Sequence, residues 1–159
     1  MTNPSAATTI DAPLALVWEV MLDTDRYGEW NPFVERADCR TPPTVGDPIV
    51  LHVRWASGRS TRSPERISAI DPPATDAEGV TTAHLAYVYE GLPARLGLVR
   101  GTRHQTLRQE AGGPTSYDTV EEFSGPLVRF AGPGRVAEGF RRHAAGLRQR
   151  AEALARPPG

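Results

Sequence analysis

The feature that constrains the fold most is an apolar stripe near the C-terminal end of the sequence. Apolar side chains recur there every three or four residues, at Val136, Phe140, Ala144, Leu147, Ala151 and Leu154. This spacing predicts an amphipathic helix of about 20 residues. Such a helix needs another element to cover its apolar side, and the rest of the chain must supply that element.

Most of the chain before this helix alternates between apolar and polar residues, which predicts half-buried strands. The alternation at 60–70 is broken or bulged near Pro64, and a loop is expected at 71–79. A turn at 111–114 predicts a hairpin between the two strands that flank it. The predicted strands are 7–10, 49–56, 60–70, 81–90, 98–109 and 115–124.

Two short helices are predicted between the first strand and the others. Leu14, Val17 and Met21 have helical spacing, so a helix is expected over 13–22, and a second short helix or turn follows at 23–30. Strands in succession, with helices set apart from them, predict an α+β fold with an antiparallel sheet. A curved sheet around the long helix need not close tightly against it, and the space left is a natural ligand cavity.

Composition and charge exclude several classes of protein. The 159 residues fit one domain, 1–159, and all 18 basic residues are arginine, which excludes a Schiff-base lysine and a phosphate-loop lysine. Cys39 is the only cysteine, so no intrachain disulfide can form. The longest apolar run, 12–18, is too short to span a membrane, and no signal peptide is visible. We therefore expect a cytoplasmic protein without membrane insertion.

No metal or cofactor is expected, and no nucleic-acid partner. The four histidines, His52, His84, His104 and His143, are scattered without the spacing of metal ligands. The long helix carries a basic stripe that admits two interpretations, a binding surface or the solvated back of the helix. A pI near 6.4 and the absence of interleaved aromatics favour the second. The stripe comprises Arg135, Arg141, Arg142, Arg148, Arg150 and Arg156.

The last hairpin places unusual polar residues on the apolar side of the sheet. If Leu107 and Phe123 point inward, then strand alternation turns Arg103, Gln105, Tyr117 and Glu121 inward as well, and on the preceding strand Tyr87 and Tyr89 share a face with Leu85. A buried arginine and glutamate are costly unless paired, so an Arg103–Glu121 pair is expected. That pair is either a structural ion pair or a polar anchor for a ligand. Arg108, Glu122 and His104 should face solvent.

Several motifs together resemble those of the START-like (SRPBCC) superfamily, in its polyketide cyclase/dehydrase-type branch. They are Ile10-Asp11-Ala12-Pro13 with Val17-Trp18, then Asp23 and Trp30-Asn31-Pro32-Phe33, and finally Glu121-Glu122-Phe123-Ser124-Gly125 before the long helix. The resemblance implies a helix-grip fold, in which a curved seven-stranded antiparallel sheet embraces the C-terminal helix around a cavity for apolar or aromatic molecules.

The resemblance also implies a polar residue on the penultimate strand and a glutamate on the last strand, which here are Arg103 and Glu121. Arg103 stands where histidine is more usual. No residue of 60–70 is nominated, because strand parity near Pro64 is ambiguous. The expected ligand-binding residues are Trp30, Trp55, Tyr87, Tyr89, Arg103, Gln105, Tyr117, Glu121 and Phe140.

Three functions are compatible with these features. The first is a protein that binds a small apolar or aromatic metabolite in the cavity. The second is a polyketide cyclase or dehydratase, with Arg103 and Glu121 as the catalytic candidates: Arg103 would stabilise an enolate, while Glu121 or a tyrosine moves protons. The third is a protein-interaction module that uses the arginine-rich back of the helix.

Overall fold

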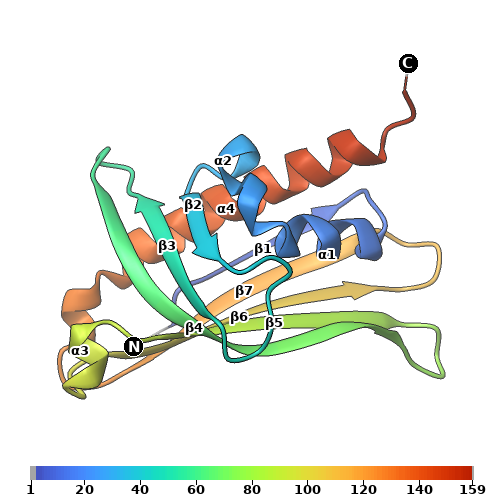
Figure 1. Ribbon diagram of the computed structural model, residues 1–159. Coiled ribbons are helices and arrows are strands. Elements are labelled where there is room, and N and C mark those ends of the chain that lie inside the picture. Colours follow the sequence, from blue (N-terminus) through green and yellow to red (C-terminus); the bar gives the residue numbers. More distant parts are fainter. Residues whose placement is uncertain (1–2, 159) are drawn as a thin grey trace.

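A single curved antiparallel sheet of seven strands forms the body of the protein (Figure 1). The structure is a computed structural model that describes residues 3–158. The strand order is β1-β7-β6-β5-β4-β3-β2, so the first strand pairs with the last and not with the second. The strands are β1 (Ser5–Ile10), β2 (Val34–Cys39), β3 (Pro48–Arg54), β4 (Ser60–Thr75), β5 (Thr81–Tyr89), β6 (Arg100–Gln109) and β7 (Thr115–Ser124).

One long helix crosses the concave side of this sheet (Figure 1). It is α4, and five positions of its apolar stripe, from Val136 to Ala151, are buried, whereas Leu154 is 50% exposed. Glycine at its N-cap adopts a left-handed conformation (Gly132, φ 70°) and Pro133 starts the helix. The predicted α+β helix-grip fold is thus confirmed. The helical segments are α1 (Leu14–Leu22), η1 (Thr24–Arg26), α2 (Tyr27–Trp30), α3 (Leu92–Arg95), η2 (Val128–Ala131) and α4 (Pro133–Ala155).

The strand β4 differs from its sequence-based prediction. It continues to Thr75 through the expected loop, and its register shifts follow Ile67 and Asp71 instead of Pro64. Pro64 stays in the ladder opposite Val50. Proline lacks only the N–H donor, and its carbonyl still accepts a hydrogen bond from the Glu90 amide. The two prolines at 72–73 lie at the second shift. Strand pairing is interrupted there, so the ladder requires no N–H donor from these residues.

The strand β2 was not predicted from the residue pattern. Only Val34 and Ala37 are buried in it, and a register shift between Val34 and Arg36 disturbs the alternation that marks a strand. The seventh strand was therefore implied by the family resemblance alone. Within residues 3–158, no helix is both long enough and apolar enough to cross a membrane.

The interior is closely packed where α2 and the start of β2 meet the middle of α4. A Cβ atom at Gly139 would lie 2.1 Å from the Phe33 ring, and one at Gly146 would lie 2.6 Å from the Trp30 carbonyl oxygen. These two glycines therefore let the helix approach the 30–33 segment closely. Asn31 fixes that segment, because its Oδ1 accepts bonds from the amides of Phe33 and Val34 at 3.0 and 2.9 Å.

Candidate functional site

A pocket of about 490 Å³ opens between the sheet and the N-terminal half of α4. Its walls come from β3 to β7, from α4 and from the two connections that include α3 and η2. Most of the lining is apolar or aromatic. Four charged side chains lie on the sheet wall, Arg62, Glu65, Arg103 and Glu121, and Arg135 lies on the helix side. A pocket of this size and polarity is typical of small-molecule sites. Its main apolar and aromatic residues are Phe33, Leu51, Val53, Trp55, Tyr89, Leu98, Phe130, Val136 and Phe140.

Arg103 is almost fully buried in β6, at the inner end of the pocket. Its Nε donates to Thr119 Oγ1 at 3.0 Å and its Nη2 donates to the Tyr117 hydroxyl at 3.4 Å. The guanidinium carbon lies 4.3 Å from the centre of the Phe140 ring, so the cation also rests on an aromatic face of α4. These contacts hold the guanidinium in one position beside the pocket.

Glu121 lies opposite Arg103 in the β6–β7 ladder and is 9% exposed. Its carboxyl occupies space left by Gly101, where a Cβ atom would come within 2.4 Å of Oε1. Loss of solvent raises the pKa of Glu121 to about 8, the charge of Glu65 adds to the rise, and Arg103 opposes it. The carboxyl therefore keeps its proton over much of the neutral range.

Glu65 is the site residue that the sequence analysis missed. It lies on β4, lines the same pocket and accepts a hydrogen bond from the Ser63 hydroxyl at 3.1 Å. Desolvation raises the pKa of Glu65 to about 7, against the opposing effects of Arg103 and Ser63. The buried Ile67 was the available signal, because counting back two residues along a strand from it gives Glu65 on the inner face.

The prediction of an Arg103–Glu121 ion pair is wrong. The two residues are direct neighbours across the strands, yet neither an ion pair nor a hydrogen bond joins their side chains. Arg103 is instead held by the hydroxyls of Tyr117 and Thr119, which leaves both carboxyls of the pocket without a tight cationic partner. Two carboxyls with pKa values near neutrality can exchange protons, and the fixed cation beside them can stabilise a developing negative charge.

The nine predicted ligand-binding residues fall into two groups. Trp55, Tyr89, Arg103, Glu121 and Phe140 line the pocket together. Trp30, Tyr87, Gln105 and Tyr117 lie outside its lining. Strand parity gave the inward direction of the three residues on the sheet in this second group, but parity does not reveal how far along the sheet the helix closes on them.

Trp30, Gln105 and Tyr117 belong to a buried network of polar and aromatic contacts, in which Gln105 Nε2 and His143 Nε2 have no hydrogen-bond partner among residues 3–158. The Tyr117 hydroxyl donates to Gln105 Oε1 at 2.8 Å, and the Asn31 amide meets His143 Nδ1 at 2.9 Å. Burial lowers the pKa of His143 well below its usual value, so the ring is neutral. Trp30 packs edge-on against the same imidazole. This network fills the interior beyond the pocket.

The remaining histidines lie on other surfaces of the sheet. His84 Nδ1 contacts Asp71 Oδ2 at 2.9 Å, its Nε2 contacts His104 Nδ1 at 2.9 Å, and His52 contacts Asp38 at 2.7 Å. Across residues 3–158, no group of three or more histidine, cysteine or acidic side chains is placed to hold a metal ion.

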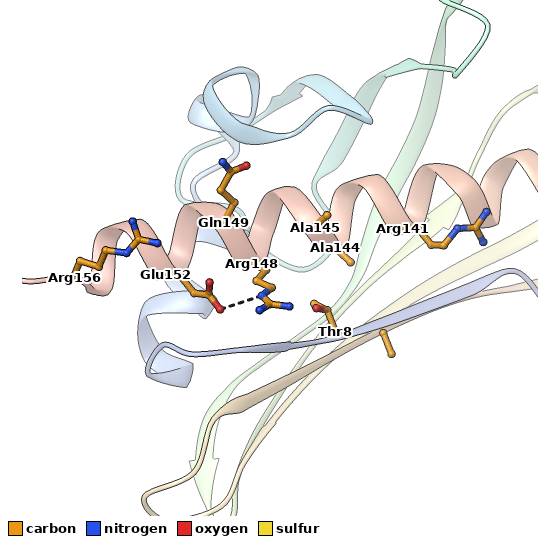
Figure 2. A pocket seen from close by; sticks show the side chains of 9 residues that line it. Thr8, Arg141, Ala144, Ala145, Arg148, Gln149, Glu152 and Arg156 are labelled. Atoms are coloured by element: carbon orange, nitrogen blue, oxygen red, sulfur yellow. Dashed lines mark hydrogen bonds and ion pairs between the residues drawn. The ribbon is translucent and has the colours of Figure 1, made fainter.

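The arginine stripe on α4 borders a separate, shallower hollow of about 350 Å³ between this helix and β1 (Figure 2). Figure 2 shows Arg141, Arg148 and Arg156 spread along the helix, without a common point toward which they turn. Arg148 pairs with Glu152 at 3.1 Å, and elsewhere on the helix Arg150 pairs with Glu29 at 3.0 Å. The Arg148 pair fits the interpretation of a solvated helix surface. Two other members of the stripe do not, because Arg135 rests on Trp55 in the pocket lining and Arg142 donates to the carbonyls of Pro32 and Arg54.

Comparison with known proteins identifies the family. A family model described as polyketide cyclase / dehydrase and lipid transport matches residues 1–155. The chain belongs to this polyketide cyclase/dehydrase family. A comparison with curated protein sequences finds no match.

Solved structures show the same fold at low sequence identity. The ZhuI aromatase/cyclase from Streptomyces sp. R1128 has 20% identity and a TM-score of 0.72, over 99% of this chain and 98% of that one. The di-domain aromatase/cyclase BexL from the BE-7585A biosynthetic pathway has 17% identity and a TM-score of 0.69, and this chain spans about half of its length (51%). Major latex-like protein 151 from Panax ginseng has 13% identity and a TM-score of 0.59, with 98% of each chain covered.

Proposed function

We propose that the protein binds one small apolar or aromatic molecule in the pocket between the sheet and α4. The observation that carries this proposal is a pocket of about 490 Å³ with mainly aromatic and aliphatic walls and a small set of charged groups, most of them on the sheet side. Apolar walls supply affinity, while a few fixed polar groups orient the ligand. Membership of a family described by polyketide cyclisation and lipid transport supports the same conclusion.

The polar groups define the chemistry expected of the ligand. Arg103 uses Nε and Nη2 to reach Thr119 and Tyr117, so Nη1 is the part of the guanidinium left for a ligand oxygen. Glu121, when protonated, adds a second donor. The ligand should therefore carry a carbonyl or phenolic oxygen at one end of an otherwise apolar body.

Titration with the neutral fluorescent probe Nile red, combined with thermal unfolding, tests the binding proposal. Saturable one-to-one binding should raise the melting temperature, because a ligand bound only by the folded state stabilises it. Leu98→Trp, which places a large ring in the pocket lining, should lower the affinity for Nile red at least about tenfold, a loss of about 1.4 kcal/mol in binding free energy. Val88→Trp, at a 36% exposed position outside the lining, is the matched control. Absence of saturable binding would contradict the proposal.

A second candidate function is dehydration or cyclisation of a polyketide-like substrate, favoured by the two carboxyls with pKa values near neutrality. Glu65, with the lower pKa, would remove a proton next to a carbonyl, and Arg103 would stabilise the resulting enolate oxygen. Glu121, with a pKa of about 8, would give its proton to the departing hydroxyl. The products would be water and a conjugated carbonyl compound.

Turnover of a β-hydroxy thioester, followed by the absorbance of the conjugated product, tests this second function. Glu65→Gln, Glu121→Gln and Arg103→Ala should each lower the rate about 100-fold or more, the usual cost of a lost acid, base or oxyanion donor. Glu122→Gln is the matched control, because this carboxylate is exposed and contacts His104 instead of the pocket. Equal rates in wild type, Arg103→Ala and Glu121→Gln would exclude the mechanism while leaving the binding proposal intact.

A further inference from the structure

The mouth of the pocket carries an unusual group of exposed apolar side chains. Leu92 is 67% exposed, Leu96 62% and Phe130 67%, and Leu127 is 38% exposed. They come from two segments far apart in the sequence, 92–98 and 127–130, which are joined by a hydrogen bond from the Leu127 amide to the Leu98 carbonyl. Figure 1 shows α3 at the same end of the molecule as the beginning of α4. We call these four side chains the apolar rim.

The apolar rim is continuous with the lining of the pocket. Leu127 and Phe130 belong to the lining as well as to the rim, and Pro93 and Leu98 join the pocket to α3. The rim residues project from two helical segments of four residues each, α3 and η2, and from the turns beside them. Four large apolar side chains gathered on short projecting segments mark an interaction surface, whereas single exposed apolar residues need no explanation.

Three arginines lie on or beside the segments that carry the rim. These segments contain no acidic residue. Glu90 lies just before them, and the pKa of its carboxyl is lowered by its hydrogen bond to Arg66 and also by the charge of nearby Arg95. Neither 91–109 nor 123–137 contains an aspartate or a glutamate. Arg95, Arg100 and Arg129 are exposed, and within residues 3–158 none of the three forms an ion pair within 4.0 Å. Arg129 lies 4.8 Å from the centre of the Phe130 ring, which places its charge beside the most exposed aromatic side chain of the rim. The partner of this surface must therefore be both negatively charged and apolar.

We propose that the apolar rim docks on a lipid membrane that contains anionic headgroups. Apolar side chains would enter the boundary between headgroups and acyl chains, and the three arginines would contact phosphate groups around them, the arrangement by which peripheral proteins bind anionic membranes. Projecting side chains on short segments fit a deformable lipid surface better than a flat protein interface, which needs about 800 Å² of matched area on each partner. The docked orientation turns the pocket toward the membrane, so an apolar molecule could pass between the two without crossing water.

Vesicle flotation tests the proposal on the full chain. We expect binding to phosphatidylcholine vesicles that contain about 30% phosphatidylglycerol, little binding to phosphatidylcholine alone, and loss of binding at about 0.5 M salt, where exposed charges are screened. The double variant Leu92→Ser with Phe130→Ser should bind at least about tenfold more weakly, and Arg95→Gln with Arg129→Gln about 25-fold more weakly, since each arginine near an anionic surface contributes about fivefold.

Matched controls come from the opposite end of α4. Leu154 is 50% exposed, and Arg156 is an exposed arginine far in sequence from the mouth, so Leu154→Ser and Arg156→Gln should bind vesicles as wild type does. Circular dichroism and the melting temperature show whether each variant is folded. A tryptophan at the rim, Phe130→Trp, should be quenched by brominated lipids beyond the wild-type background, whereas Leu154→Trp should not.

Three outcomes would overturn the proposal. The first is the absence of binding to anionic vesicles at low salt, and the second is equal weakening by the rim variants and the Leu154 and Arg156 controls. The third is binding to poly-glutamate but not to vesicles, which would point to an acidic protein as the partner. Nile red binding is measured separately in solution, so failure of membrane docking and failure of the pocket proposal can be told apart.

Discussion

The two halves of the concave interior use polar side chains in opposite ways. In the packed half, one hydrogen bond joins Asn31, which follows α2, to His143 on α4, and another joins Tyr117 on β7 to Gln105 on β6. In the open half, around the pocket, Glu65 and Glu121 stay without a tight cationic partner and keep raised pKa values. Paired groups fix the fold, and groups left open to a cavity remain available to a ligand. Four predictions test this division.

The largest effect is expected from Asn31→Ala in the packed half. The change removes the acceptor of two buried amides, those of Phe33 and Val34, and the partner of His143 Nδ1. Each buried group left without a partner costs about 1–3 kcal/mol, so the free energy of unfolding should fall by about 3–5 kcal/mol in urea denaturation. Thr41→Ala, which removes an exposed bond to Asp25, should change it by less than about 0.5 kcal/mol. Equal stability of Asn31→Ala and wild type would remove the distinction between the halves.

The open half should make stability depend on pH. Glu65 and Glu121 have higher pKa values in the folded protein than the ordinary value of 4.5, so the folded state binds more protons than the unfolded chain above about pH 4.5. The contribution of these two groups to stability is then full below that pH and is lost as pH rises through about 7 to 8. We expect a loss of about 2–5 kcal/mol between pH 5 and pH 8 in urea unfolding. Glu121→Gln should flatten this dependence, and a flat wild-type profile would contradict the raised pKa values.

The same chemical change in each half gives a closer comparison. Tyr117→Phe removes the hydroxyl that donates to Gln105 and accepts from Arg103, so the free energy of unfolding should fall by about 1–2 kcal/mol. Tyr89→Phe, in the pocket lining, should change it by less than about 0.5 kcal/mol. Thermal and urea unfolding of both variants measure the difference, and equal losses would show that the pocket tyrosine is structural too.

The smallest effect on stability is expected from Gly101→Ala. The new Cβ would overlap the flexible end of Glu121 and lie 3.2 Å from the Phe123 ring, so the carboxyl should move into the pocket at a cost below about 1 kcal/mol. Greater contact with water should lower the pKa of Glu121 from about 8 toward its ordinary value. Carbon NMR titration of the carboxyl measures this shift. Gly134→Ala, where a Cβ atom meets nothing within 4 Å, should leave the titration unchanged.

The sequence predicts which face of the sheet a side chain lies on, but not how far the pocket extends along that face. Alternation along β6 and β7 predicted that Arg103 and Glu121 point inward, because side-chain direction along a strand has a period of two. It missed Glu65, since Pro64 obscured the period, and it missed β2, whose alternation a register shift disturbs. It could not separate Trp55 from Trp30. Their separation depends on how closely α4 approaches at Gly139 and Gly146, which is a property of packing between distant segments.

The pairing of β1 with β7 has a consequence for synthesis on the ribosome. Ser5–Ile10 find their partners in Thr115–Val120, so the first strand has no paired edge until more than two thirds of the chain has been made. Contacts between such distant segments slow folding, and an unpaired strand edge is prone to association with other chains. The nascent chain therefore leaves this short strand unpaired until the hairpin of β6 and β7 has been made.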